Sequence, residues 1–205
     1  LVRRRGLVAY EDATAVARLR AAGAIPMGVT NTSELCLWME SNNYVYGRTN
    51  NPYDPTRTVG GSSGGEGAIV GAGASPFGLG SDIGGSIRMP AFFNGVFGHK
   101  PTGGLVPATG QYPKATGVAL KSLTTGPLCR RATDLMPLLQ IMAGPDGEDE
   151  GCVAFELGNP AEVDVKALRI LNLAKIDGLP VHPSLAHRQA ILVDWFRRQG
   201  ARVED

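Results

Sequence analysis

The chain has 205 residues, of which 43% are hydrophobic and 19% are charged, and its formal net charge at pH 7 is +1. These proportions are typical of a soluble globular chain with a buried core and exclude a disordered tail. The 20 basic and 19 acidic residues are interspersed, so no broad basic surface for nucleic acid is expected. The run Arg3 to Arg5 is interpreted as a solvated end.

The cysteines and the hydropathy pattern bear on the cellular compartment. Cys36, Cys129 and Cys152 are odd in number and widely spaced, which predicts neither a disulfide framework nor a zinc site and favours a reducing, intracellular location. No uncharged apolar run reaches the roughly 18 residues needed to cross a bilayer. Residue 1 is leucine, so a membrane anchor further upstream in a longer parent remains open.

The first predicted elements are a helix and a strand. Residues 12–22 place Val16 and Leu19 at helical spacing, and Gly23 stands where a glycine commonly ends a helix. The next residues, 24–29 (AIPMGV), predict a short buried strand.

Helices and strands alternate again toward the C-terminus. The predicted elements are a helix over 133–144, a strand over 168–176, a helix over 184–199 capped by Ser184 and stopped by Gly200, and a strand over 201–204. This order predicts an α/β architecture with a largely parallel or mixed sheet. The last strand begins where the sequence ends, so we expect a fragment of a larger domain.

Residues 60–104 differ from both flanks because 15 of these 45 residues are glycine. A phosphate-binding loop is disfavoured, since Glu66 stands where the motif needs a lysine and would repel an anion. Residues 60–64 (GGSSG) satisfy the G-x-S-x-G pattern of the α/β-hydrolases, with Ser62 as nucleophile. That alternative lacks a strand-like segment before Ser62 and needs a histidine base from His99, His182 or His187.

A second serine has a different setting. Gly84 and Gly85 leave consecutive backbone N–H groups unshielded immediately before the hydroxyl of Ser86. Such a turn can hold a developing oxyanion beside its nucleophile, especially if a helix begins near Ser86. A plain helix cap after a glycine turn is the alternative.

The segment GGSSGGEGAIVGAGASPFGLGSDIGGSIRMPAFFNGVFGHKPTGG closely resembles the signature of the amidase signature family. Glu66, Ile83 and AFFNGVFGHKPT are most similar to its fatty-acid amide hydrolase branch, and the resemblance covers residues 12 to about 145. It implies a large mixed β-sheet flanked by helices and incomplete at both ends. Residues 1–205 would be part of a single amidase domain with its signature core at about 60–104.

The resemblance also implies roles for individual residues. Ser86 would be the nucleophile, and Ser62, in a cis peptide after Gly61, would relay a proton. Ser63 and Arg88 would support this pair by hydrogen bonding. Asp82 would brace the turn. The oxyanion hole would consist of the backbone N–H groups of Ile83, Gly84, Gly85 and Ser86.

The base in this family is a buried, neutral lysine on a strand upstream of the helix at 12–22. Only LVRRRGLVAYE precedes that helix here, and Lys100 in GHKPT matches a structural lysine instead. We therefore expect two members of the triad without the third, and an inactive or weakly active chain. His99 is expected to be a hydrogen-bonded structural residue.

Substrate and partners are further expectations from the resemblance. Cys36, Leu37 and Met39 would line an acyl channel, although they are equally consistent with a core. The ligand would be a small amide, with a lipid amide as one candidate, no cofactor or metal would be needed, and a homodimer is a candidate assembly. The alternative from a different class is a catalytically dead fragment that binds acyl ligands or a partner subunit.

Overall fold

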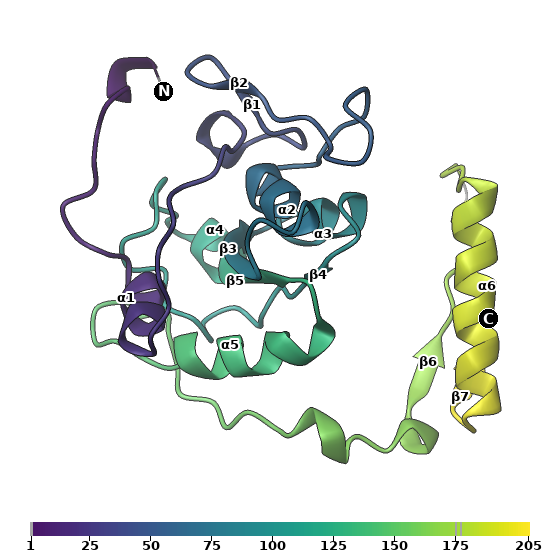
Figure 1. The fold of residues 1–205 in the computed structure, drawn as a ribbon. Helices are drawn as coiled ribbons and strands as arrows, with labels where there is room; N and C mark the ends of the chain where they lie inside the picture. The colour runs from purple at the N-terminus through teal and green to yellow at the C-terminus, as the bar shows by residue number, and fades with distance from the viewer. Residues whose placement is uncertain (1, 175, 177) are drawn as a thin grey trace. The chain divides into compact units, whose positions relative to one another are not determined.

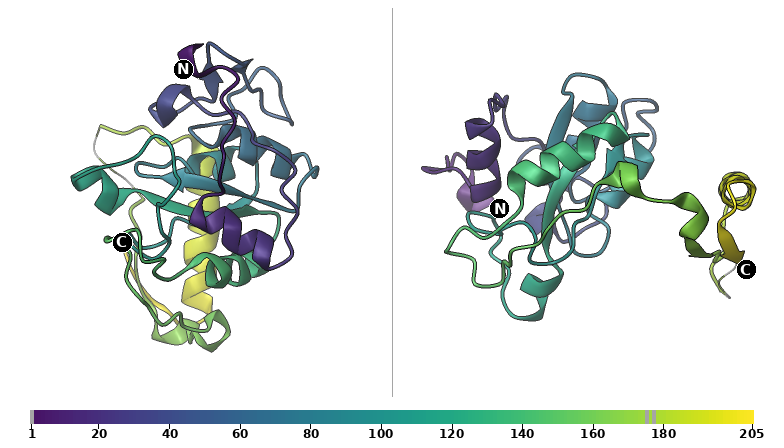
Figure 2. Two further views of the ribbon diagram at one scale, coloured as in Figure 1. Left: turned by 90° about the vertical axis from the view of Figure 1, so that its left-hand side faces the viewer. Right: turned by 90° about the horizontal axis from the view of Figure 1, so that it is seen from below.

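The computed structural model describes residues 2–174, 176 and 178–205 and divides into two compact units, 1–157 and 158–205. Figures 1 and 2 show helices and strands alternating along both units. The larger unit contains η1 (Val2–Arg4), α1 (Thr14–Ala21), η2 (Glu34–Cys36), β1 (Asn42–Asn43), β2 (Gly47–Arg48), α2 (Gly64–Gly71), β3 (Phe77–Asp82), α3 (Arg88–Phe93), β4 (Phe97–Gly98), α4 (Val118–Ser122), β5 (Thr124–Cys129), η3 (Ala132–Asp134) and α5 (Leu135–Met142). The smaller unit contains η4 (Pro160–Glu162), η5 (Val165–Ala167), β6 (Arg169–Leu171), α6 (Pro183–Arg198) and β7 (Arg202–Glu204). The assignment of 1–205 to a single domain stays a prediction.

The central sheet of the larger unit has the strand order β3-β5-β4. β3 and β5 pair antiparallel from Phe77 opposite Cys129 to Asp82 opposite Thr124, and β4 pairs antiparallel with β5. Within the described residues, β3 therefore has one edge without a strand partner. The loop that carries Ser86 follows directly after the C-terminal end of β3.

Two apolar clusters fix this sheet. α1 packs against α5 (Figure 2). Their cluster contains buried Leu19, Leu139 and Met142. A second cluster joins Ile87 and Leu128 with neighbouring small residues. Each fully buried side chain of this size contributes about 1.5–3 kcal/mol. The second cluster anchors the residue next to Ser86, which ties the position of this serine to the core.

The two helices that the sequence predicts in the larger unit are confirmed, and the strand predicted at 24–29 is wrong. The helix predicted over 12–22 is α1, and the helix predicted over 133–144 is η3 followed by α5. Residues 24–29 form no strand, and the side chains of Ile25 and Val29 are 86% and 101% exposed. A strand needs a neighbour for its backbone hydrogen bonds. None of the described strands pairs with this segment.

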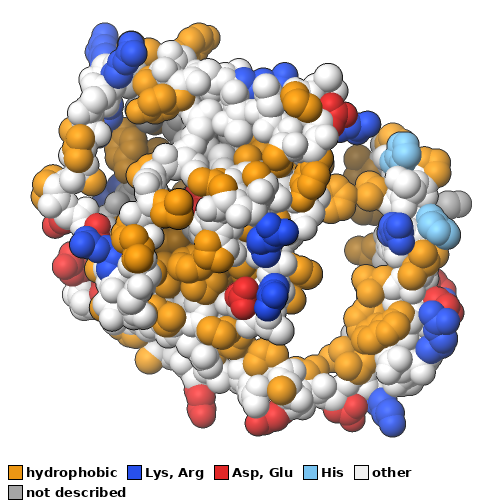
Figure 3. All heavy atoms as spheres, viewed as in Figure 1, with side chains coloured by type: hydrophobic (Ala, Val, Ile, Leu, Met, Phe, Trp, Pro, Cys, Tyr) orange, Lys and Arg blue, Asp and Glu red, His pale blue; other side chains and the backbone are white. Residues whose placement is uncertain are grey.

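In the smaller unit, α6 connects the parallel strands β6 and β7. The strand predicted over 168–176 corresponds to β6, which is shorter and ends at Leu171. Residue 175 of the predicted range lies outside the described residues. The cap at Ser184 is wrong: His182 is the N-cap and accepts a hydrogen bond from the Ser184 N–H. Pro183 takes the first helical turn, where its missing N–H costs nothing. Figure 3 shows hydrophobic side chains exposed along α6.

Candidate active site

Ser62 and Ser86 lie on two loops that one backbone hydrogen bond joins. Ser62 lies in the loop before α2, and Ser86 lies between β3 and α3. The N–H of Ser63 donates to the Ser86 carbonyl oxygen at 3.2 Å. Both serines line the same cavity of about 260 Å³. The structure thus brings together two hydroxyls that lie 24 positions apart in the sequence.

The two hydroxyls are not engaged elsewhere. Ser62 is 1% exposed and Ser86 is half-buried, and neither Oγ takes part in a hydrogen bond with the part of the chain that the structure describes. A buried hydroxyl normally finds a partner, so a free pair facing one cavity is chemically notable. Such hydroxyls are available to a substrate or to each other.

The Gly61–Ser62 peptide bond is cis, as predicted. A Cβ on Gly61 would stand 2.7 Å from the backbone of residues 38–40, and one on Gly65 would stand 2.5 Å from the Asn31 backbone. These separations are far below ordinary contact distances, so the glycines permit other segments to approach the serine loop closely. This explains the glycine density before α2.

Ser41 holds the Ser62 loop, although nothing in the sequence analysis pointed to it. Its Oγ accepts a hydrogen bond from the Gly64 N–H at 2.8 Å and lies 3.1 Å from Gly60 O and 3.0 Å from Ser62 O. Ser41 is 1% exposed. No pattern marks this serine 21 residues before Ser62, so only the three-dimensional contacts identify it.

Asp82 organises the loop around Ser86. The fully buried Asp82 carboxylate accepts hydrogen bonds from the N–H groups of Gly85, Ile87 and Arg88 at 2.7, 3.0 and 3.2 Å. The Arg88 side chain adds two at 3.0 Å each, in bidentate geometry. Burial alone would raise the pKa of Asp82, but these donors outweigh it and hold the pKa below its usual range. The carboxylate therefore stays ionised and fixes the loop.

These contacts revise the expected roles of the supporting residues. Arg88 binds Asp82 rather than either serine hydroxyl. The Ser63 hydroxyl accepts from the Ser81 N–H at 3.3 Å and donates to Ser81 O at 3.5 Å, which ties its loop to β3. Because the Gly85 N–H donates to Asp82, it does not face the cavity as an oxyanion donor. Helix α3 begins at Arg88, two residues beyond Ser86.

Some of the residues predicted for the oxyanion hole and the substrate pocket line the cavity with Ser86, and others do not. Ile83 lines the cavity with Ser86, while Gly84 is exposed beside it. Cys36 and Leu37 also line this cavity. Met39 does not belong to the lining and is 60% exposed.

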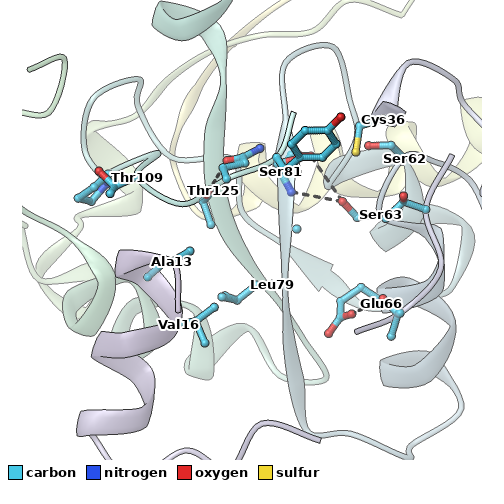
Figure 4. Close-up of a pocket in the computed structure, with 17 residues that line it drawn as sticks. Ala13, Val16, Cys36, Ser62, Ser63, Glu66, Leu79, Ser81, Thr109 and Thr125 are labelled. Carbon is cyan, nitrogen blue, oxygen red and sulfur yellow. Dashed lines mark hydrogen bonds between the residues drawn. The ribbon is translucent and has the colours of Figure 1, made fainter. Parts of the chain in front are cut away.

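A second cavity of about 220 Å³ shares Cys36, Ser62, Ser81 and Gln111 with the first. Figure 4 shows Ser62, Ser63 and Glu66 around it. The Thr30 hydroxyl donates to Glu66 Oε2 at 2.5 Å. Burial raises the pKa of Glu66, against the hydrogen bonds from Thr30 and the Leu79 N–H. From the sequence, Glu66 was assigned no role in a site and was an argument against a phosphate-binding loop.

The remaining candidates lie outside these two cavities. Burial lowers the pKa of His99, and its ring makes no hydrogen bond with the described residues, which differs from the expected hydrogen-bonded histidine. Burial raises the pKa of Cys129 to about 11.

No group of His, Cys, Asp and Glu side chains suited to a metal ion occurs in the described ranges. None of the described helices combines the length and apolar composition needed to cross a membrane.

The chain belongs to the amidase family, because the family model described as Amidase matches residues 3–205. Among its relatives, fatty-acid amide hydrolase 2-A of Danio rerio is 55% identical over 210 residues, covering 100% of this chain and 38% of its own length. Fatty-acid amide hydrolase 2 of Homo sapiens is 62% identical over 145 residues, covering 71% of this chain and 27% of its own length. The chain therefore spans well under half of these relatives.

A solved structure confirms the fold prediction. The structure of 6-aminohexanoate cyclic dimer hydrolase complexed with substrate matches with a TM-score of 0.85 at 31% sequence identity. The match covers 99% of this chain and 43% of that hydrolase. The α/β amidase-signature fold is thus established for this chain.

Proposed function

We propose that the chain carries the serine pair of an amide hydrolase acting on fatty-acid amides. The observation that carries this proposal is the pair of unengaged hydroxyls, Ser62 and Ser86, on one cavity. Two further features support it: the Ser63-to-Ser86 backbone hydrogen bond and the Asp82 network. Together they hold the two loops in one arrangement, as a preorganised site requires.

In the proposed reaction, Ser86 Oγ attacks the amide carbonyl carbon, and the hydroxyl proton passes to Ser62. The carbonyl oxygen becomes an oxyanion stabilised by the N–H groups of Ile83, Gly84 and Ser86. The intermediate then expels the amine, which receives a proton through Ser62, and leaves an acyl group on Ser86. Water hydrolyses this ester and restores the enzyme.

The base is proposed to be a neutral lysine amine that exchanges protons through Ser62, as the family resemblance implies. Lys100 does not suit this role, because its Nζ donates to the Ser122 carbonyl oxygen at 3.1 Å. The open edge of β3 and the exposed residues 24–29 can accept a neighbouring strand that bears such a lysine. We therefore propose that the isolated 205-residue chain reacts slowly.

Two observations support a lipid-like acyl group. Leu35, Leu37 and Leu123 line the cavity with Ser86. The relatives from Danio rerio and Homo sapiens are named fatty-acid amide hydrolases. An apolar lining favours an alkyl chain because burial of each CH₂ contributes about 0.8 kcal/mol.

Labelling with an alkyl fluorophosphonate tests the proposal on the 205-residue chain. We expect phosphonylation at Ser86 that Ser86→Ala abolishes and Ser62→Ala slows by about a hundredfold, the lower end of the range for lost proton transfer. Ser75→Ala is the control, because Ser75 lies outside both cavities, and it should label normally.

Other labelling patterns would support the alternatives. No labelling at Ser86 would favour a passive ligand- or partner-binding fragment. Labelling at Ser62 would favour the hydrolase elbow, which needs a strand directly before it. Residues 51–63 instead contain one isolated bridge, from Thr58 to Asn50.

A further inference from the structure

The cavity that holds Ser86 contains one cationic side chain, Lys114. Lys114 lines it together with its chain neighbours Pro113 and Ala115, so this short segment forms one wall. No carboxylate of the described residues lies within ion-pair distance of the Lys114 amine. The ammonium therefore has no counter-charge among the described residues.

The other residues that line the cavity do not supply a counter-charge either. No Asp or Glu belongs to this cavity lining, so its formal charge is +1. Gln111 contributes a second donor: Thr125 Oγ1 donates to its Oε1 at 3.0 Å, which leaves the amide NH₂ without a partner in the described chain. The lining thus includes the exposed Lys114, the Gln111 amide and the hydroxyls of Ser62, Ser81 and Ser86, and its one formal charge favours an anion.

We propose that Lys114 selects amide substrates that carry a carboxylate close to the scissile bond, the chemical class of N-acyl amino acids and half-amides of dicarboxylic acids. This inference rests on the proposed function for the identity of the reacting serine. Lys114 and Ser86 line the same cavity of about 260 Å³, so we expect one small ligand to reach both residues. The flexible four-carbon stem of lysine lets the ammonium follow it.

Binding to the Ser86→Ala chain tests the proposal without chemistry. The probes are N-hexanoylglycine against N-hexanoylethanolamine, and 6-amino-6-oxohexanoic acid against hexanamide, titrated into isotopically labelled protein and followed by NMR. The first pair places the carboxylate in the amine half and the second in the acyl half. For at least one pair we expect the anionic ligand to bind about two- to fivefold more tightly in low salt, with the ratio falling toward one in about 0.5 M NaCl.

Substitutions identify the residue responsible. Lys114→Gln should remove the anionic preference, and Lys114→Arg should keep it. Lys121→Gln removes the same charge from the neighbouring α4 outside this cavity, and it should leave the ratio unchanged. Equal affinity for both members of each pair, or a preference that survives Lys114→Gln, would overturn the proposal.

The proposed function can fail independently, since it depends on the site of fluorophosphonate labelling. A Lys114-dependent preference without Ser86 labelling would retain the anion site and reject the hydrolase. Ser86 labelling without a preference would retain the hydrolase and reject the role of Lys114.

Discussion

The serine loops between residues 59 and 98 and the segment 25–29 belong to the same compact unit but differ in how far other residues cover them. Asp82 in the first region is 0% exposed and fully hydrogen-bonded, whereas Ile25 and Val29 in the second are 86% and 101% exposed. Isolated exposed apolar residues are ordinary, but a run of them in an extended segment leaves a surface that favours contact. The difference shows that contacts within the described chain suffice to arrange the serine loops and do not cover residues 25–29.

The contrast predicts a large difference in hydrogen exchange. The amides of Gly85 and Ile87 donate to the buried Asp82 carboxylate, whereas residues 25–29 donate to no other backbone group that the structure describes. We expect the first pair to exchange at least about 10³-fold more slowly than the amides of Ile25 and Val29. Mass spectrometry of exchanged peptides measures this, and equal protection in both regions would refute the comparison.

Removing the Asp82 charge should give the largest loss of stability. Asp82→Asn leaves the Arg88 guanidinium without its partner and places an NH₂ against backbone donors, so we expect a loss of about 3 kcal/mol in urea unfolding. Asp54→Asn is the matched control because Asp54 pairs with Arg57 at an exposed position. It should change the unfolding midpoint little. Similar shifts for both variants would contradict the importance of the buried network.

Ser41→Ala should have a smaller effect. The variant removes the acceptor of the Gly64 N–H and the donor to Gly60 O and Ser62 O, which predicts a loss of about 2 kcal/mol. It should also slow phosphonylation of Ser86, because Ser62 loses its support. Ser75→Ala breaks a single bond, to Phe77 O, and should cost about 1 kcal/mol with normal labelling. A Ser41→Ala chain as stable as wild type would show that other contacts hold this loop.

Acid should weaken the serine region in a way that depends on Asp82. Its folded-state pKa lies below the unfolded value of about 3.9, so its contribution is fully present above that pH and is lost as the pH falls through the folded pKa. The Asp82→Asn chain should therefore lose less stability below about pH 4 than wild type. Parallel pH profiles of unfolding free energy would contradict this assignment.

The same contrast explains what the sequence could predict. Helical periodicity is a local property, and it located α1, α5 and α6 correctly. The strand at 24–29 depends on a partner that the local pattern does not specify, and there the prediction failed.

Within the site, too, the sequence could not predict contacts between residues that lie far apart along the chain. The resemblance predicted the cis peptide and placed Asp82 in the turn, and the structure has both; the roles of the two serines stay predictions. Ser41 was missed because its role comes from contacts across about 20 residues that no motif encodes. The engagement of the Gly85 N–H by Asp82 was missed because it depends on how the loop folds back.

A crystal structure of the phosphonylated chain tests the central claim most directly. We predict phosphorus on Ser86 Oγ, with the phosphoryl oxygen about 2.7–3.1 Å from the backbone nitrogens of Gly84 and Ser86. Ser62 Oγ should lie within hydrogen-bond reach of Ser86 Oγ, at about 2.6–3.2 Å. Phosphorus on Ser62, or a phosphoryl oxygen turned away from the residue 83–86 loop, would contradict it.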